Sequence, residues 1–115
     1  MAAKRMTPLP SSVFNILLAL GEGEMHGYAI MRRVEEITDG SVSMGPGTLY
    51  GSLKRMLADE LVEETDARPD PELDDERRRY YRVTALGAQA RASEVARLES
   101  LLRRARSGQA RARVT

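Results

Sequence analysis

The sequence predicts a mainly α-helical domain with a small β-hairpin. Up to residue 61, apolar residues recur at helical spacing in three successive segments. Two short β-prone runs follow, and a stretch rich in Pro and Asp separates them. The chain then returns to helical spacing. Three helices, two strands and a fourth helix, in that order, are typical of a winged helix-turn-helix, in which a β-hairpin follows the third helix.

The first two helices are delimited by capping residues and glycines. Ser11 or Ser12 can cap the first helix, and the GEG sequence that follows its apolar run stops it. The second helix is expected to begin near Glu24, and Asp39 with Gly40 closes it. Both segments carry apolar residues at helical spacing, so we expect each helix to bury one face.

The third helix is expected to begin at Pro46, because the first helical turn tolerates proline. Its apolar stripe consists of Leu49, Leu53, Met56, Leu57 and Leu61. The runs LVEET at residues 61–65 and RRRYYRVT at residues 77–84 are predicted to form a hairpin with a long loop. Thr84 then opens the last helix.

The last helix carries an apolar stripe at heptad-like spacing, formed by Val95, Leu98, Leu102 and Ala105. This stripe extends beyond what a compact three-helix core can cover, so we expect a partner helix of a second copy to cover it. Packing on the domain's own core is the alternative. The predicted division is a flexible N-terminus at 1–8, a winged-helix domain at 9–84, a dimerisation helix at 85–106 and a disordered tail at 107–115.

Composition and charge bound the function. A chain of 115 residues forms one domain, and its lack of Cys excludes disulfides and fits a reducing, cytoplasmic compartment. No apolar run is long enough to span a membrane. The net charge of +1 conceals a nearly neutral first half, an acidic stretch at 61–76 and a basic end from residue 77. A local basic excess of this kind suits a polyanion or an acidic partner.

The sequence GPGTLYGSLKRM at residues 45–56 could be a phosphate-binding loop or the start of a helix presented to a larger partner. A Walker loop requires Lys directly after its second glycine, whereas here Ser52 follows Gly51. The dinucleotide pattern also fails, because Gly45, Gly47 and Gly51 have the wrong spacing. The segment is therefore interpreted as the entry turn of the third helix, whose unpaired amides favour phosphate.

Five polar or aromatic residues of the third helix remain outside its apolar stripe and form the predicted recognition set: Thr48, Tyr50, Ser52, Lys54 and Arg55. Hydroxyl groups can reach phosphates or base edges, and the two cations can neutralise phosphates. For an isolated helix, a merely solvated basic face would be the better interpretation. The hairpin that follows the helix reverses this preference in favour of DNA.

Four motifs, in order, are HGYAI at 26–30, GPGTLYGSLKRM at 45–56, ELVEE at 60–64 and RRRYYRVTALG from 77 onward. Together they resemble the PadR family of transcriptional regulators, over roughly residues 9 to 105. The resemblance implies a dimeric winged-helix repressor that a small-molecule effector releases from operator DNA. It places Thr48, Tyr50 and Lys54 on the operator-facing helix and the last helix in the dimer interface.

The resemblance also places Arg77, Arg78 and Arg79 on the wing. Here the wing loop is acidic, with Asp66, Asp70, Glu72, Asp74, Asp75 and Glu76, and these charges would repel a phosphate backbone. We therefore expect the loop tip to turn aside and the three arginines at its base to contact DNA. Many family members carry proline where this chain has Gly51, so we expect a less rigid turn there.

The remaining candidates favour binding over catalysis. His26 is the single histidine, which excludes a multi-histidine metal site and a catalytic triad; it is expected to fix the start of the second helix, with a pH-sensing role as the alternative. We expect no enzyme activity, metal or cofactor. The predicted partners are duplex operator DNA, a second copy of the chain and a small hydrophobic effector. A winged-helix module that binds an acidic protein is the alternative function.

Overall fold

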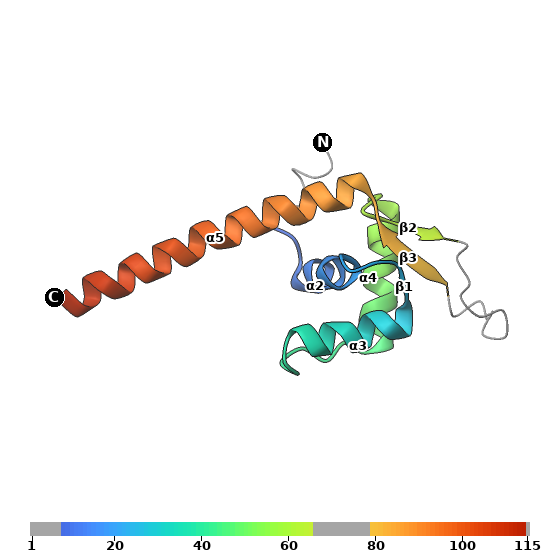
Figure 1. Cartoon of the computed structure of the whole chain (residues 1–115), viewed down its shortest axis with the longest axis horizontal. Coiled ribbons are helices and arrows are strands. Elements are labelled where there is room, and N and C mark those ends of the chain that lie inside the picture. The colour runs from blue at the N-terminus through green and yellow to red at the C-terminus, as the bar shows by residue number, and fades with distance from the viewer. Residues whose placement is uncertain (1–7, 66–78, 115) are drawn as a thin grey trace.

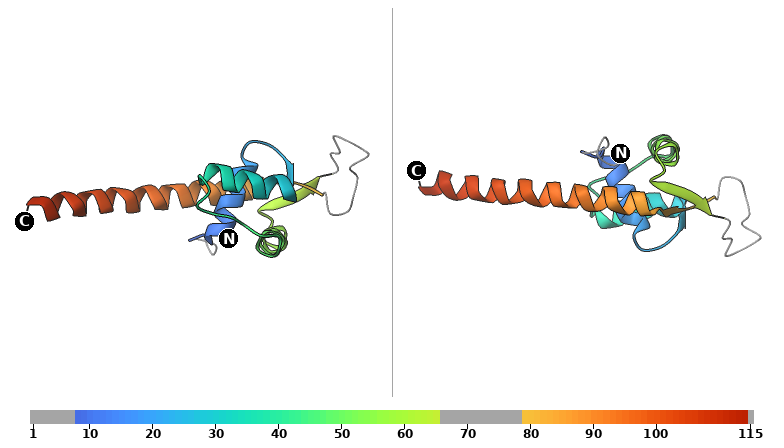
Figure 2. Two further views of the ribbon diagram at one scale, coloured as in Figure 1. Left: turned by 90° about the horizontal axis from the view of Figure 1, so that it is seen from below. Right: turned by 90° about the horizontal axis from the view of Figure 1, so that it is seen from above.

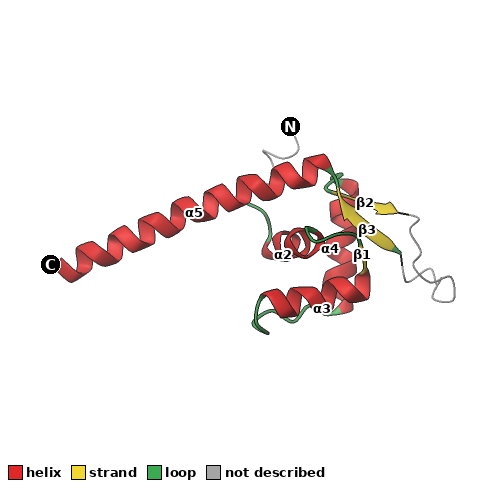
Figure 3. Cartoon of the chain, in the orientation of Figure 1, coloured by secondary structure: helices red, strands yellow, loops and turns green. Residues whose placement is uncertain are grey.

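The computed structural model of the chain describes residues 8–65 and 79–114. Its elements follow in the order α2 (Ser11–Leu20), β1 (Met25–His26), α3 (Gly27–Ile37), α4 (Pro46–Ala58), β2 (Val62–Thr65), β3 (Tyr80–Val83) and α5 (Ala85–Val114). The helices form the body, and the small sheet lies at one end of it (Figure 1, Figure 3). The predicted fold class, a winged helix-turn-helix with a C-terminal helix, is confirmed.

Helix α2 is the centre of the core. It packs against α3, α4, α5 and β3, and Ile16, Leu17 and Ala19 are fully buried. Ile30 and Val34 of α3 are likewise inaccessible to solvent, and the apolar faces of the other elements close over them. Aliphatic burial around one central helix is thus the main stabilising contribution, as expected for a core with a single Phe and no Trp.

The sheet has three strands rather than the two of a hairpin, in the order β1-β3-β2. Met25 pairs with Tyr81 and His26 with Tyr80, so the second helix begins at Gly27 and not near Glu24. The imidazole Nδ1 of His26 accepts a hydrogen bond from the amide of Ala29 at 3.2 Å. The expectation that His26 fixes the start of this helix is confirmed, because it is the N-cap residue.

Helix α4 begins with Pro46 and buries Leu49, Leu53 and Met56. It ends at Ala58, before the predicted end of the apolar stripe, because Glu60 adopts a left-handed conformation with φ of 61°. Leu61 is fully buried all the same, and its amide donates to the carbonyl of Met56 at 2.9 Å. The stripe therefore continues into the core through a turn instead of through helix.

Strands β2 and β3 form the wing, and Thr84 caps α5 by accepting a hydrogen bond from the amide of Gly87 at 3.0 Å. Helix α5 was expected to end at residue 106, yet it continues to Val114. Its last turns are rich in Ala and Arg, which are strong helix formers, so the helix propagates past Gly108.

Helix α5 crosses α2 near its start and then leaves the body. Two further views show it as a nearly straight rod that extends away from the sheet (Figure 2). It gives the molecule a longest extent of 64 Å against 33 Å and 22 Å in the other directions. Within the part of the chain that the structure describes, no helix is both long enough and apolar enough to cross a bilayer.

Candidate nucleic-acid interface

The outward face of α4 is built from short and basic side chains. Thr48, Lys54 and Arg55 are exposed, as the helical spacing predicted. Ser52 is half-buried, because its hydroxyl donates to the hydroxyl of Ser12 on α2 at 3.1 Å. The structure thus brings three of the five predicted residues to the open face and turns Ser52 toward the domain.

Tyr50 lies at the edge of this face. Its side chain is 39% exposed, but the phenol reaches across to the first residue of α3. A Cβ built on Gly27 would lie 2.5 Å from the hydroxyl oxygen of Tyr50, so the polar end of this ring rests on the α3 backbone. Sequence reasoning placed Tyr50 outside the stripe correctly but could not give the direction of its hydroxyl.

The electrostatics of α4 favour an anion. The helix has no acidic residue along its length, and its first intrahelical bond runs from the amide of Leu49 to the carbonyl of Gly45 at 3.0 Å. The amides of Gly47 and Thr48 precede that bond and so carry the partial positive charge of a helix N-terminus. Among the described residues, no carboxylate lies within ion-pairing distance of Lys54.

Arg55 has a carboxylate neighbour at the C-terminal end of α4, where Asp59 is the C-cap residue. Its guanidinium lies 3.9 Å from Asp59, at the limit for an ion pair, and its side chain is 60% exposed. An exposed i,i+4 pair of this kind contributes only about 0.3–0.5 kcal/mol. Arg55 can therefore exchange Asp59 for a phosphate at small cost.

The described wing arginines lie closer to their acidic neighbours than Arg55 of α4 lies to Asp59. Arg79 lies 3.2 Å from Glu64, and Arg82 lies 3.0 Å from Glu63, which is its direct partner in the β2–β3 register. Exposed pairs of this kind are worth about 0–1 kcal/mol and are screened by salt. Arg77, Arg78 and the acidic loop, which complete the predicted wing contact, lie outside the described residues.

Two adjacent tyrosines of β3 face opposite sides of the sheet. Tyr81 is buried, while Tyr80 is half-exposed and meets the ring of His26 edge-on, with ring centroids 5.5 Å apart. Burial raises the pKa of the Tyr81 phenol, and the nearby Glu64 and Tyr50 raise it further. The sequence left open which tyrosine points inward, and the structure assigns that place to Tyr81.

Helix α5 exposes an apolar stripe beyond its contact with α2. Val95 and Leu98 are 37% and 38% exposed, and Leu102 is 49% exposed. Ala105, the last residue of the predicted apolar stripe, is also exposed. Leu101, also 49% exposed, was not predicted; its spacing of three residues from Leu98 was the available signal.

The junction between α5 and the N-terminal segment contains one buried carboxylate. Glu94 is 3% exposed, accepts a hydrogen bond from the amide of Leu9 at 3.3 Å and pairs with Arg97 at 2.6 Å. The Arg97 guanidinium lowers the pKa of Glu94, the Leu9 amide acts in the same direction, and burial opposes both. Within the described residues, no group of three His, Cys, Asp or Glu side chains could hold a metal ion.

A helix-turn-helix made by α3 and α4, followed by the β2–β3 wing, defines a winged-helix regulator of transcription. Residues 16–93 match the transcriptional regulator PadR-like family, and the chain belongs to that family. The recognition based on the four motifs is confirmed. Members of this family are transcriptional regulators and not enzymes.

Several solved structures share this fold. A transcriptional regulator from Clostridium thermocellum superposes with a TM-score of 0.69 at 23% identity, over 84% of this chain and 87% of that one. The RosR protein of H. salinarum gives a TM-score of 0.66 at 28% identity, over 93% of this chain and 94% of its own. A PadR-like transcription factor from Bacteroides fragilis gives a TM-score of 0.70 at 20% identity, over 90% of this chain and 95% of that one.

A sequence relative of a different size also matches. An uncharacterized 37.1 kDa protein in a transposon of Streptomyces fradiae is 45% identical over 47 residues. The match covers 41% of this chain but only 13% of that protein. It therefore concerns one segment of a much longer chain.

Proposed function

We propose that this chain is a dimeric repressor that binds duplex DNA with α4 in the major groove. The observation that carries the proposal is the character of the exposed α4 face. It combines the first-turn amides with Thr48, Lys54 and Arg55 and has no carboxylate between Pro46 and Ala58. Amides and cations supply phosphate contacts, and the hydroxyl and guanidinium groups can also reach base edges.

The wing supports the same proposal with a weaker contribution. The pairs Arg79–Glu64 and Arg82–Glu63 are exposed and weak, so either arginine can turn to a phosphate beside the groove that α4 occupies. Arg77 and Arg78, at the base of the loop, are proposed as further phosphate contacts. Most of the non-specific affinity is then assigned to α4, because Lys54 and Arg55 can bind a phosphate without breaking a strong ion pair.

The α5 stripe supports dimerisation. Val95, Leu98 and Leu102, with Ala105 on the same stripe, leave apolar surface open along a rod that projects from the body. A second copy of α5 would cover this surface by helix packing and would place two α4 helices for half-sites about 34 Å apart. A Leu98→Glu, Leu102→Glu variant is expected to sediment as a folded monomer, while the wild type sediments as a dimer. A monomeric wild type would contradict this part of the proposal.

Repression by such a dimer needs no chemistry, because an occupied operator excludes other proteins. A small hydrophobic effector could act by changing the spacing of the two α4 helices, and the proposed place for it is the dimer interface beside α2 and α5. Leu18 of α2 is 36% exposed and supplies apolar surface on that helix. Titration of the dimer with hydrophobic compounds in the presence of its duplex tests this step.

The test of DNA binding compares two charge deletions. A duplex is first selected from a random-sequence pool by the wild-type protein. Lys54→Ala is expected to weaken binding to this duplex and to random duplex alike, and to reduce the slope of log K against log salt by about one unit. Arg104→Ala removes the same charge from exposed α5 and is expected to leave both quantities unchanged. If the wild type selects no duplex but retains an acidic protein instead, the interaction-module alternative replaces this proposal.

A further inference from the structure

The contact between Tyr50 and Gly27 carries an inference that rests on the proposed DNA binding. Gly27 is buried at the first position of α3. A Cβ at this position would lie 2.5 Å, 2.9 Å and 3.0 Å from Oη, Cζ and Cε1 of Tyr50, all shorter than van der Waals contact. The phenol of Tyr50 therefore occupies the space that a side chain at residue 27 would need.

The backbone of Gly27 does not itself require glycine. The glycines with positive φ in the described chain are Gly23 and Gly40, and Gly27 is not among them. Alanine at an ordinary helical position would be more favourable by about 0.5–1 kcal/mol. The ring of Tyr50 is thus the structural reason for glycine at residue 27.

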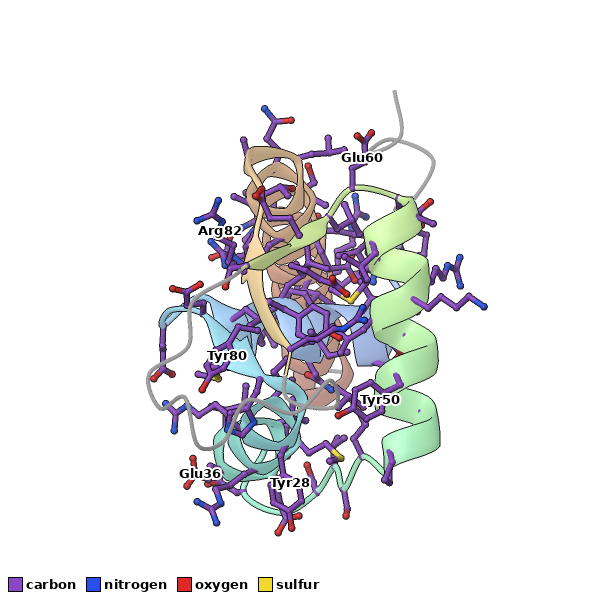
Figure 4. The ribbon with its side chains drawn as sticks, turned by 90° about the vertical axis from the view of Figure 1, so that its right-hand side faces the viewer. Tyr28, Glu36, Tyr50, Glu60, Tyr80 and Arg82 are labelled. Carbon is purple, nitrogen blue, oxygen red and sulfur yellow. The ribbon has the colours of Figure 1, made fainter. Side chains whose placement is uncertain are left out.

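The point that Tyr50 touches is a junction of three elements. Gly27 follows β1 directly, and the two residues of β1 pair with Tyr80 and Tyr81 of β3. His26, the last residue of β1, also caps α3. Tyr50 extends from α4 toward this junction, with Tyr80 on the neighbouring strand (Figure 4). A displacement of the ring would consequently change the position of α4 relative to both α3 and the wing.

We infer that Tyr50 is a positioning residue: its ring, seated on Gly27, sets the distance of α4 from α3 and the wing, so that α4 and the wing can engage one duplex together. A base-reading tyrosine presents its hydroxyl to the partner. In Tyr50 the hydroxyl is the atom nearest to a Cβ built on Gly27, although the residue as a whole is 39% exposed. This assignment separates Tyr50 from Thr48, Lys54 and Arg55, which remain the direct contacts of the proposed interface.

The atom that an alanine methyl at residue 27 would meet is the end of a side chain, which can move. Gly27→Ala is therefore expected to fold and to displace Tyr50 instead of disrupting the core. On the selected duplex it is expected to bind about tenfold more weakly, with an unchanged salt slope because no phosphate contact is removed. Gly108→Ala, at an exposed position of α5 with no neighbour within 4 Å, controls for the helix-propensity change and is expected to bind as the wild type does.

The double variant supplies the decisive comparison. Tyr50→Ala should weaken binding to the selected duplex without relaxing the preference at any single base pair. Gly27→Ala, Tyr50→Ala should bind no more weakly than Tyr50→Ala alone, because the methyl then displaces nothing. Additive losses, or relaxed preference at one or two base pairs in Tyr50→Ala, would overturn the inference while leaving the DNA-binding proposal intact. Failure of the wild type to bind any duplex would instead refute the proposed function.

Discussion

Five glycines of the described chain lie in helices. Apart from Gly108 in the last turns of α5, they divide into two pairs with opposite surroundings. Gly27 is the first residue of α3, and Gly87 lies in the first turn of α5. At these two joints a Cβ would meet the hydroxyl of Tyr50 at 2.5 Å and the carbonyl oxygen of Leu61 at 2.0 Å, respectively. Gly47 and Gly51 lie on the outward face of α4, where a Cβ would meet nothing within 4 Å. Packing within the chain explains why glycine occupies the first two positions, but it does not explain the glycines of the second pair.

The difference indicates what each region is built for. Glycine inside a helix is less favourable than alanine by about 0.5–1 kcal/mol, and neither Gly47 nor Gly51 has a positive φ. Helix α4 therefore carries two residues that weaken it, on the face that also holds Lys54 and Arg55. If α4 lies in a groove of DNA, the absent side chains allow its backbone to approach the duplex closely. The joints are then optimised for stability and the α4 face for contact.

The largest expected effect is at the α5 joint. In Gly87→Ala the new methyl would overlap the backbone oxygen of Leu61, which cannot rotate away as a side chain can. We expect a loss of about 3 kcal/mol in the free energy of unfolding, measured by urea denaturation. Gly108→Ala on the same helix should instead gain about 0.5–1 kcal/mol. Equal stability of the two variants would show that the α5 joint tolerates a side chain and would remove the contrast between the two pairs.

A smaller effect is expected at the second contact that holds α5 to the body. Glu94→Gln keeps an acceptor for the amide of Leu9 but loses the charged partner of Arg97, so we expect a loss of about 1–2 kcal/mol at neutral pH. The pKa of Glu94 is lowered from its ordinary value of 4.5, chiefly by Arg97. Its carboxylate therefore stabilises the folded chain above pH 4.5, and the contribution is lost as the pH falls through the lowered folded value.

The pH dependence distinguishes this role from mere packing. The stability difference between wild type and Glu94→Gln, measured by thermal unfolding from pH 7 downward, should shrink once the pH falls below about 4.5. Glu99→Gln, at an exposed position of the same helix, should leave stability nearly unchanged at every pH. A difference that stays constant with pH would assign Glu94 a packing role without an ionic contribution.

The order of helices and strands was largely predictable from the sequence. Helical spacing predicted every helix of the described chain, and the β-prone runs predicted both wing strands, because these signals are local. The predicted cap of the first helix was wrong: Pro10 is the N-cap of α2, no side chain caps it, and Ser11 is already the first helical residue. Strand β1 was missed, since its two residues pair with Tyr80 and Tyr81, far away in the sequence, and carry no local turn signal. The end of α5 was also misjudged: Ser107 and Gly108 suggested a loose tail, while the surrounding Ala and Arg residues sustain the helix to Val114.

The candidate site was predictable in its composition but not in its directions. Helical spacing located Thr48, Lys54 and Arg55 on the open face. The hydrogen bond of Ser52 to Ser12 and the seat of Tyr50 on Gly27 depend on how α4 packs against α2 and α3, which no pattern within α4 encodes. The same holds for the carboxylate partner of Arg79, which requires the β2–β3 register.

The smallest change in stability, with the most informative consequence, is expected at Gly51. Gly51→Ala adds a methyl to an exposed helical position with open space around it, so the free energy of unfolding should rise by about 0.5–1 kcal/mol. If α4 lies in the groove, the same methyl stands between its backbone and the duplex, and affinity for the selected duplex should fall about tenfold, measured by fluorescence anisotropy. Gly108→Ala should show the gain in stability without the loss of affinity. An unchanged affinity in Gly51→Ala would show that this face of α4 does not approach DNA closely, and the contrast between the two glycine pairs would then lack a functional cause.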